Sequence, residues 1–309
     1  MAIYDAFHLS ATETRPGYID QIRQIPQEYF AAPAAKAGRV ERVEYTAPRL
    51  DRPGETCRKY CLVYLPWEYD QNPDRRYNIL YMIHGGGGSP EEYLPQDGPF
   101  VRMLDHSIQN GEIAPMIVVA PTYYPPDSGD ISVDFSGVCT AAFMGEMKGC
   151  ILPEVEGRYR TFAPSADMDG FAASRAHRGI GGFSMGSVTT WYAFQQALSC
   201  FGWFLPLSGD SWIEGRRGGV YYPMTTARKL ARAVQQQGFT PEDYLIYCIT
   251  GSNDIAWDAV DAQIHAMQKQ QDAFRFGTNI FYGLKDGGWH SVEEVRHYAY
   301  HALPDFFAE

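Results

Sequence analysis

Short apolar runs alternate along the chain with longer segments in which apolar residues recur at helical spacing. This alternation is typical of strands joined by helical crossovers, and it predicts an α/β fold with a mostly parallel central sheet flanked by helices. The later apolar runs are nearly continuous, as in strands that are covered on both faces. The predicted strands are residues 39–47, 57–66, 77–84, 116–122, 177–183, 201–208, 244–251 and 278–284.

The first two predicted strands differ from the rest. Both alternate between apolar and polar side chains, and the turn-rich stretch "PRLDRPGET" separates them. We therefore expect them to form an antiparallel pair at one edge of the sheet. Helical spacing predicts helices at residues 98–110, 139–156, 185–199, 224–237, 258–274 and 291–302.

Two segments, 123–136 and 209–223, fit neither period and carry turn residues. They are predicted to be surface loops over the carboxyl edge of the sheet. Nothing in the chain resembles a linker between two domains. We expect an N-terminal extension at residues 1–38 that packs on a single catalytic domain at residues 39–309.

Composition and charge narrow the classes of partner. The 309 residues are 45% hydrophobic and 20% charged, as in an ordinary globular protein with a sizeable core. The net charge of −11 argues against nucleic acid and against an anionic membrane, because both would repel the protein. A neutral substrate, such as an uncharged sugar, is easier to accommodate. The sequence does not indicate an oligomeric state.

Cysteine usage and the start of the chain give two further expectations. The six cysteines form no C-x-x-C and stand at no metal-ligand spacing from histidines, so neither a metal nor a cofactor is expected. No basic segment followed by an apolar run opens the chain, and no apolar run approaches 18 residues. The chain as it stands is expected to be cytoplasmic, or secreted if a leader has been removed.

The stretch "HRGIGGFSMGSVTTW", residues 177–191, contains the pattern G-x-S-x-G around Ser184. In this pattern a nucleophilic serine lies on a strained turn from strand to helix, and the flanking residues must be small. The alternative is a plain glycine-rich bend. An apolar predicted strand before Ser184 and a helical pattern after it favour the nucleophile.

A serine hydroxyl needs a histidine base and a carboxylate, which in α/β-hydrolases follow the serine in the order acid, then histidine. His290 lies in "LKDGGWHS", between a predicted strand and a predicted helix, whereas His265, His297 and His301 lie within predicted helices. In "ITGSNDIAW" the best acid is Asp254, directly beyond another strand. A helix N-cap is its alternative role, and Asp258 is the nearest rival.

The glycines of "YMIHGGGGSPEEY" follow a predicted strand, so their amides can approach an oxyanion without obstruction. The predicted donors are the amides of Gly86 and Met185, with Gly85 as the next choice, and His84 is expected to pack beneath the loop. No GK[ST] and no full G-x-G-x-x-G argue against a nucleotide site. Asp167 and Asp169 lack the further spaced ligands of a calcium loop, which favours a solvated loop.

Five stretches in order resemble the feruloyl esterases of carbohydrate esterase family 1, which are related to esterase D-like hydrolases and mycolyltransferases. They are "YNILYMIHGGGGSPEEYL", "SRAHRGIGGFSMGSVTTWY", "LPLSGDSW", "TGSNDIAWD" and "GGWHSVEEVRHY", within residues 40–305. The resemblance implies an α/β-hydrolase fold without a large lid. It also implies metal-independent hydrolysis of hydroxycinnamate esters, such as ferulate on the arabinose of xylan, by Ser184, Asp254 and His290.

The resemblance further implies that Asp210 and Trp212 shape the substrate pocket. Trp212, Trp257 and Trp289 are candidates to stack on an aryl or sugar ring, with core packing as the alternative for each. The expected partner is a feruloylated xylo-oligosaccharide or another small ester. The alternatives are an acetyl xylan esterase, a small thioester hydrolase of the esterase D type, an acyltransferase, or a non-catalytic carbohydrate-binding protein. Residues 1–38 and 209–223 match no pattern of the family, which leaves the acyl-group preference open.

Overall fold

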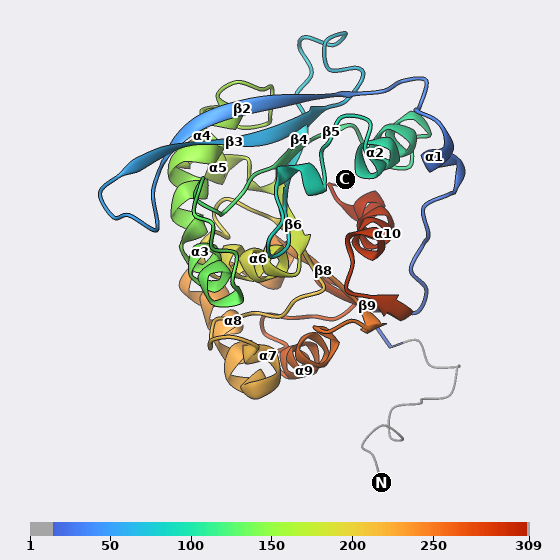
Figure 1. The fold of residues 1–309 in the computed structure, drawn as a ribbon. Coiled ribbons are helices and arrows are strands. Elements are labelled where there is room, and N and C mark those ends of the chain that lie inside the picture. Colours follow the sequence, from blue (N-terminus) through green and yellow to red (C-terminus); the bar gives the residue numbers. More distant parts are fainter. Residues whose placement is uncertain (1–14, 308–309) are drawn as a thin grey trace.

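A mostly parallel sheet forms the centre of the computed structural model, which describes residues 15–307 (Figure 1). Its nine strands lie in the order β1-β9-β8-β7-β6-β4-β5-β3-β2. Their bounds are β1 Tyr18–Ile19, β2 Arg39–Pro48, β3 Thr56–Leu65, β4 Asn78–Ile83, β5 Met116–Ala120, β6 Arg178–Phe183, β7 Trp203–Leu207, β8 Leu245–Asn253 and β9 Ile280–Trp289.

Ten α-helices connect and cover the strands within the described residues. Their bounds are α1 Glu28–Ala31, α2 Pro99–Gln109, α3 Val133–Glu146, α4 Leu152–Glu156, α5 Met168–Ala173, α6 Met185–Gln196, α7 Gly218–Tyr221, α8 Pro223–Gln236, α9 Trp257–Met267 and α10 Val292–Ala302. A π-helical turn at Met147–Ile151 joins α3 to α4.

The strand directions agree with the predicted sheet. β2 and β3 pair antiparallel along ten residues, β3 pairs antiparallel with β5, and every other neighbouring pair of strands is parallel. β2 lies at the end of the strand order, so the predicted antiparallel pair at one edge is confirmed. The parallel strands bring their carboxyl ends to one edge of the sheet, and the loops that follow these strands meet there.

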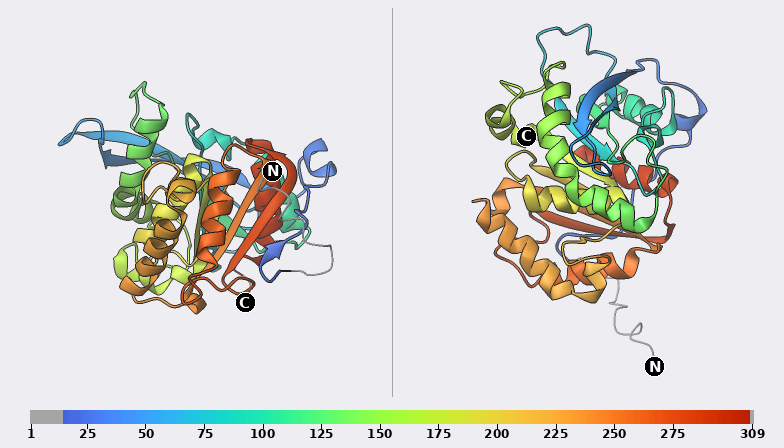
Figure 2. Two further views of the ribbon diagram at one scale, coloured as in Figure 1. Left: turned by 90° about the horizontal axis from the view of Figure 1, so that it is seen from below. Right: turned by 60° about the vertical axis from the view of Figure 1, so that its left-hand side comes forward.

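Helices cover both faces of the sheet because the central strands are apolar on both sides (Figures 1 and 2). In β4, Ile79, Tyr81 and Ile83 belong to the core beneath α3, α6, α8 and α9. Leu80 and Met82 belong to the second core, beneath α2 and α10. Alternate side chains of one strand point to opposite faces, so a continuous apolar run fills both cores.

Four predicted boundaries are wrong. α3 begins at Val133, inside the predicted loop 123–136, because the Ser132 side chain accepts the amide of Phe135 and caps the helix. α7 lies inside the predicted loop 209–223. α9 ends at Met267, several residues before the predicted end at 274. β9 continues through the glycines of "LKDGGWHS" to Trp289, where it pairs with Asn253 beside an irregularity in β8.

The described part of the N-terminal segment, residues 15–38, lies against the domain. β1 pairs in parallel with β9, and Ile25 and Tyr29 are buried in the core beneath α2 and α10. Residues 1–14 of the predicted extension lie outside the described residues. Within residues 15–307, no helix combines the length and apolar character needed to cross a membrane.

Candidate active site

Ser184 lies in the turn between β6 and α6 with a backbone conformation of φ 54° and ψ −110°. A positive φ is costly for a residue with a Cβ, so the surrounding structure must hold it in place. The flanking glycines explain how the turn fits. A Cβ on Gly182 would lie 2.4 Å from the carbonyl oxygen of Ile83, and one on Gly186 would lie 2.0 Å from the same atom. The G-x-S-x-G pattern thus corresponds to a strand-to-helix turn that excludes side chains on both sides of the serine.

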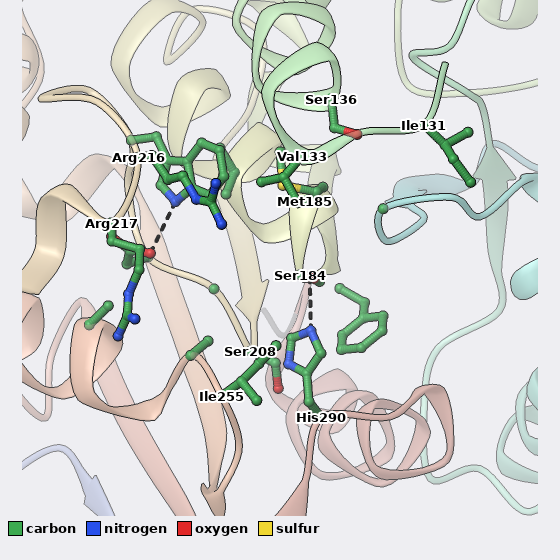
Figure 3. A pocket seen from close by; sticks show the side chains of 18 residues that line it. Ile131, Val133, Ser136, Ser184, Met185, Ser208, Arg216, Arg217, Ile255 and His290 are labelled. Carbon is green, nitrogen blue, oxygen red and sulfur yellow. Dashed lines mark hydrogen bonds between the residues drawn. The ribbon is translucent and has the colours of Figure 1, made fainter. Parts of the chain in front are cut away.

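Three side chains from the ends of three strands form a hydrogen-bonded row. The Nε2 atom of His290 lies 2.9 Å from the Oγ atom of Ser184 (Figure 3), and its Nδ1 atom lies 2.7 Å from Oδ1 of Asp254. A carboxylate only accepts hydrogen bonds, so Nδ1 of the neutral imidazole carries the proton and Nε2 accepts from the serine hydroxyl. This is the tautomer that a general base for Ser184 requires.

Burial and a second hydrogen bond hold Asp254 in place. It is buried, and its Oδ1 atom also accepts the amide of Ala256 at 2.7 Å. The rival acid Asp258 instead forms an exposed ion pair with Arg217. Of the rival histidines, His297 accepts the amide of Ile25, and His301 also binds the backbone of the N-terminal segment. The rivals therefore have structural partners away from Ser184.

The glycine loop after β4 presents one unbonded amide. The amide of Gly85 donates to Oε1 of Glu92 at 3.1 Å, that of Gly87 donates to the hydroxyl of Tyr124 at 2.9 Å, and that of Gly88 donates to the carbonyl of Gly85 at 3.1 Å. The amide of Gly86 has no acceptor within residues 15–307. The prediction of Gly85 as a further donor is therefore wrong, because its N–H is already bonded to a carboxylate.

Met185 provides a second amide on the other side of the serine. It is the first residue of α6, so its N–H has no acceptor inside the helix. A Cβ added to Gly86 would lie 3.3 Å from Cγ of Met185, which shows how closely the two residues approach. The amides of Gly86 and Met185 are thus the pair that can receive an oxyanion beside Ser184.

His84 packs beneath the glycine loop, where it is fully buried. Its Nδ1 atom lies 2.7 Å from the carbonyl oxygen of Gly85, and its Nε2 atom lies 2.8 Å from Oγ1 of Thr122. Burial lowers the pKa of His84 to about 4, so the ring is neutral at physiological pH. Since the carbonyl oxygen can only accept, Nδ1 donates and Nε2 accepts from Thr122.

A cavity of about 470 Å³ opens beside Ser184 at the carboxyl edge of the sheet. Figure 3 shows Arg216 and Arg217 on one side of this pocket and Ile131 on the opposite side. Both segments that were predicted to lie over this edge contribute to the wall. The lining residues are Gly86, Ile131, Val133, Ser136, Phe183, Ser184, Met185, Val188, Ser208, Gly209, Asp210, Trp212, Arg216, Arg217, Ile255, Ala256, Ala259 and His290.

Two of the four predicted substrate-binding residues, Asp210 and Trp212, line the pocket. Trp257 and Trp289 are not among its lining residues, and their role in stacking stays a prediction. Trp289 is the last residue of β9, directly before His290, and it is 64% exposed. Trp257 is the first residue of α9 and directly follows Ala256, which lines the pocket.

Asp210 is buried and supports the pocket wall. Its Oδ1 atom accepts from the indole of Trp212 at 3.2 Å, and its Oδ2 atom accepts the amide of Gly219 at 2.8 Å. Burial raises the pKa of Asp210 to about 6, although these hydrogen bonds act in the opposite direction. Asp210 therefore orients Trp212 and ties α7 to the segment after β7.

Sequence reasoning did not identify the apolar and cationic parts of the pocket. Ile131 lies just before α3 and Val133 is the first residue of that helix. Ile255 follows Asp254, and Arg216 and Arg217 come from the loop before α7. The exposed side chain of Ile255 adjoins a predicted triad member, and that adjacency was the available signal. Asp167, weighed as a calcium ligand, caps α5, and no metal-binding cluster occurs among the described residues.

Comparison with known proteins identifies relatives of this chain by sequence and by fold. No family model matches the chain. It is 38% identical over 295 residues to endo-1,4-beta-xylanase Y of Acetivibrio thermocellus, a match that covers 94% of this chain and 25% of the relative. The chain thus spans about a quarter of that protein's length.

Solved structures match over nearly the whole chain. A mutant of the feruloyl esterase module from Clostridium thermocellum, complexed with sinapinate, is 35% identical with a TM-score of 0.80, and the match covers 96% of this chain and 97% of that one. A structure described as FAE is 36% identical with the same TM-score and coverage. A ferulic acid esterase from Anaeromyces mucronatus in complex with ferulic acid, 15% identical with a TM-score of 0.68 and coverage of 92% and 96%, shares the fold.

Proposed function

We propose, because this chain belongs to the feruloyl esterases of carbohydrate esterase family 1, that it hydrolyses hydroxycinnamoyl esters of plant cell-wall polysaccharide such as arabinoxylan. The observation that carries the proposal is the row of hydrogen bonds from Asp254 through His290 to Ser184 at the mouth of a pocket. This arrangement supports a serine esterase that forms an acyl-enzyme.

In the first step, Ser184 Oγ attacks the ester carbonyl while His290 Nε2 takes the hydroxyl proton. Asp254 stabilises the imidazolium that forms, and the amides of Gly86 and Met185 receive the negative charge on the former carbonyl oxygen. The tetrahedral intermediate then collapses. The bond from the carbonyl carbon to the sugar oxygen breaks, and His290 returns the proton to the departing alcohol.

In the second step, water attacks the acyl-enzyme with His290 again as the base. The ester bond to Ser184 breaks, the proton returns to Oγ, and the hydroxycinnamic acid leaves. The pocket wall at Ile131, Val133 and Val188 supports an acyl group with an aromatic ring, because apolar side chains favour a planar hydrophobic group. A cavity of about 470 Å³ is ample for a single hydroxycinnamoyl group.

The experiment that tests this proposal is a panel of hydrolysis rates for methyl ferulate, acetylated xylan and a short-chain thioester. We expect the highest kcat/KM for methyl ferulate. A higher value for acetylated xylan or for the thioester would overturn the acyl preference while leaving the esterase mechanism intact.

A fluorophosphonate probe separates an enzyme from a non-catalytic carbohydrate-binding protein. The probe labels an activated serine, so we expect labelling of the wild type and none of Ser184→Ala. Xylan binding without labelling of the wild type would favour the binding protein.

A further inference from the structure

Three hydroxyl-mediated hydrogen bonds connect the glycine loop to the first turn of α3. The amide of Gly87 donates to the hydroxyl of Tyr124 at 2.9 Å, and this hydroxyl lies 2.5 Å from Oγ of Ser136. Ser136 Oγ lies 2.8 Å from the carbonyl oxygen of Ser132 and donates to it. Each hydroxyl has one proton. Because the Ser136 hydroxyl donates its proton to the carbonyl oxygen of Ser132, the Tyr124 hydroxyl must donate to Ser136 Oγ. The direction of every bond in the row is therefore fixed.

The row is buried, which makes it costly to break. Ser136 is fully buried and Tyr124 is 9% exposed, so water cannot readily replace either partner. Loss of one hydroxyl would leave a buried donor or acceptor unsatisfied. The ring of Tyr124 also stacks against His84, with 5.7 Å between the ring centroids.

The two sides of Gly86 are anchored differently. On one side, the carbonyl of Gly85 accepts from the hydroxyl of Tyr123 at 2.8 Å and from Nδ1 of His84 at 2.7 Å, and the amide of Gly85 is bonded to Glu92. On the other side, Gly87 has a positive φ of 73°, and its amide is held by the Tyr124 hydroxyl. The direction of the unbonded Gly86 amide therefore depends on the bond between Gly87 and Tyr124.

The far end of the row belongs to the pocket wall. Ser136 and Val133 line the pocket, and so does Ile131. A Cβ on Gly87 would lie 3.4 Å from Cδ1 of Ile131. The segment at the start of α3 that faces the acyl group is thus joined to the segment that presents the oxyanion donor.

We infer that Tyr124 is a positioning residue for the oxyanion hole, which aims the amide of Gly86 by holding Gly87 and is itself oriented by Ser136. The inference rests on the proposed esterase function of Ser184. Its consequence concerns the transition state, because the oxyanion exists only after Ser184 has attacked. The Tyr124 hydroxyl should therefore influence kcat much more than substrate binding.

The test is Tyr124→Phe, which removes the hydroxyl and keeps the ring that stacks against His84. Since removal of a complete oxyanion donor costs a hundredfold to a thousandfold in kcat, we expect misalignment of one donor to lower kcat for methyl ferulate by about tenfold or more. KM should change by less than about threefold. Affinity for a boronic acid that forms a tetrahedral adduct on Ser184 should fall in parallel with kcat/KM, whereas affinity for ferulate should stay unchanged.

A second variant, Ser136→Ala, removes the acceptor of the Tyr124 hydroxyl. We expect a smaller loss of kcat in the same direction. If both residues act through one row of bonds, the double variant should be no slower than Tyr124→Phe alone. Independent, multiplying losses in the double variant would overturn the role of Ser136.

Tyr64→Phe is the matched control, because the Tyr64 hydroxyl donates to Oδ1 of Asp105 in the core beneath α2 at 2.7 Å. It also removes a buried tyrosine hydroxyl, so we expect a lower Tm with unchanged kcat. The inference fails if Tyr124→Phe keeps kcat within twofold of wild type. It also fails if boronate and ferulate affinities fall equally.

Ser184→Ala, measured alongside, separates the two proposals. If it remains active, or if the wild type hydrolyses no ester, the proposed function fails. If Ser184→Ala is inactive while Tyr124→Phe behaves as wild type, only the inference about Tyr124 fails.

Discussion

At the scale of single residues, the proposed triad could be predicted from the sequence because each member adjoins a strand that ends at the same edge. Asp254 and His290 lie 36 residues apart in the chain, yet Oδ1 of Asp254 lies within hydrogen-bond distance of Nδ1 of His290. The predicted roles of Trp257 and Trp289 do not follow from the sequence in the same way. Whether they face the pocket depends on the direction of their side chains relative to their neighbours, and a motif does not determine that direction.

Asp210 gives a prediction about pH. Burial raises its pKa from 3.8 to about 6, so the folded state binds this proton more tightly than the unfolded chain. Its contribution makes the free energy of unfolding fall as pH rises from about 4 to about 6 and leaves it constant above that range. Asp210→Asn lacks this titration and keeps an acceptor oxygen.

We therefore expect the free energy of unfolding of Asp210→Asn, relative to wild type, to rise by up to about 3 kcal/mol between pH 4 and pH 7. Urea unfolding of both proteins across this range measures the difference. A difference that is independent of pH would show that Asp210 does not titrate there.

At the scale of elements, the strands were more predictable than the boundaries of helices and loops. All six residues of β6 are buried, including Arg178, which forms a buried ion pair with Glu156. By contrast, the start of α3 depends on the Ser132 cap, and the extension of β9 depends on the close approach of Gly251 and Gly288. Both are tertiary or capping effects that hydrophobic spacing does not record. For the same reason, Ile131, Val133, Arg216 and Arg217 of the two predicted loops were not predicted to line the pocket, whereas Asp210 and Trp212 were.

The turn between β6 and α6 is tested by Gly186→Ala. The added Cβ would lie 2.0 Å from a backbone oxygen of Ile83, and neither chain segment can move without disturbing the sheet. We expect a loss of about 3 kcal/mol or more in the free energy of unfolding, measured by chemical denaturation.

Gly145→Ala is the matched control, because Gly145 lies in α3 and its added Cβ meets nothing within 4 Å. It should stabilise the protein by up to about 1 kcal/mol, since alanine favours a helix more than glycine does. Equal effects of the two substitutions would contradict the steric explanation of the motif.

At the scale of the whole molecule, the N-terminal segment at residues 15–38 packs against the last helix and the last strand. β1 extends the sheet beyond β9, and His297 and His301 of α10 accept backbone amides from this segment. The sequence predicted that the extension packs on the domain, but not where. Contacts between residues more than 270 positions apart in the chain leave no local pattern.

Ile25→Ala tests whether this segment is an integral part of the folded unit. Ile25 is 3% exposed, so its truncation should cost about 2 kcal/mol or more, as in other protein cores. Val138→Ala on α3 is the control, because Val138 is 61% exposed and its truncation should cost about 0.5 kcal/mol or less. Similar losses in the two variants, measured by thermal unfolding, would mean that residues 15–38 contribute little to stability.

The most direct measurement of the central claim is kcat for methyl ferulate in Ser184→Ala and in wild type under the same conditions. Without the serine hydroxyl no acyl-enzyme can form, so kcat should fall by at least about a thousandfold while the Tm stays close to that of wild type. Retention of near-wild-type kcat in a folded Ser184→Ala variant would contradict the assignment of Ser184 as the nucleophile.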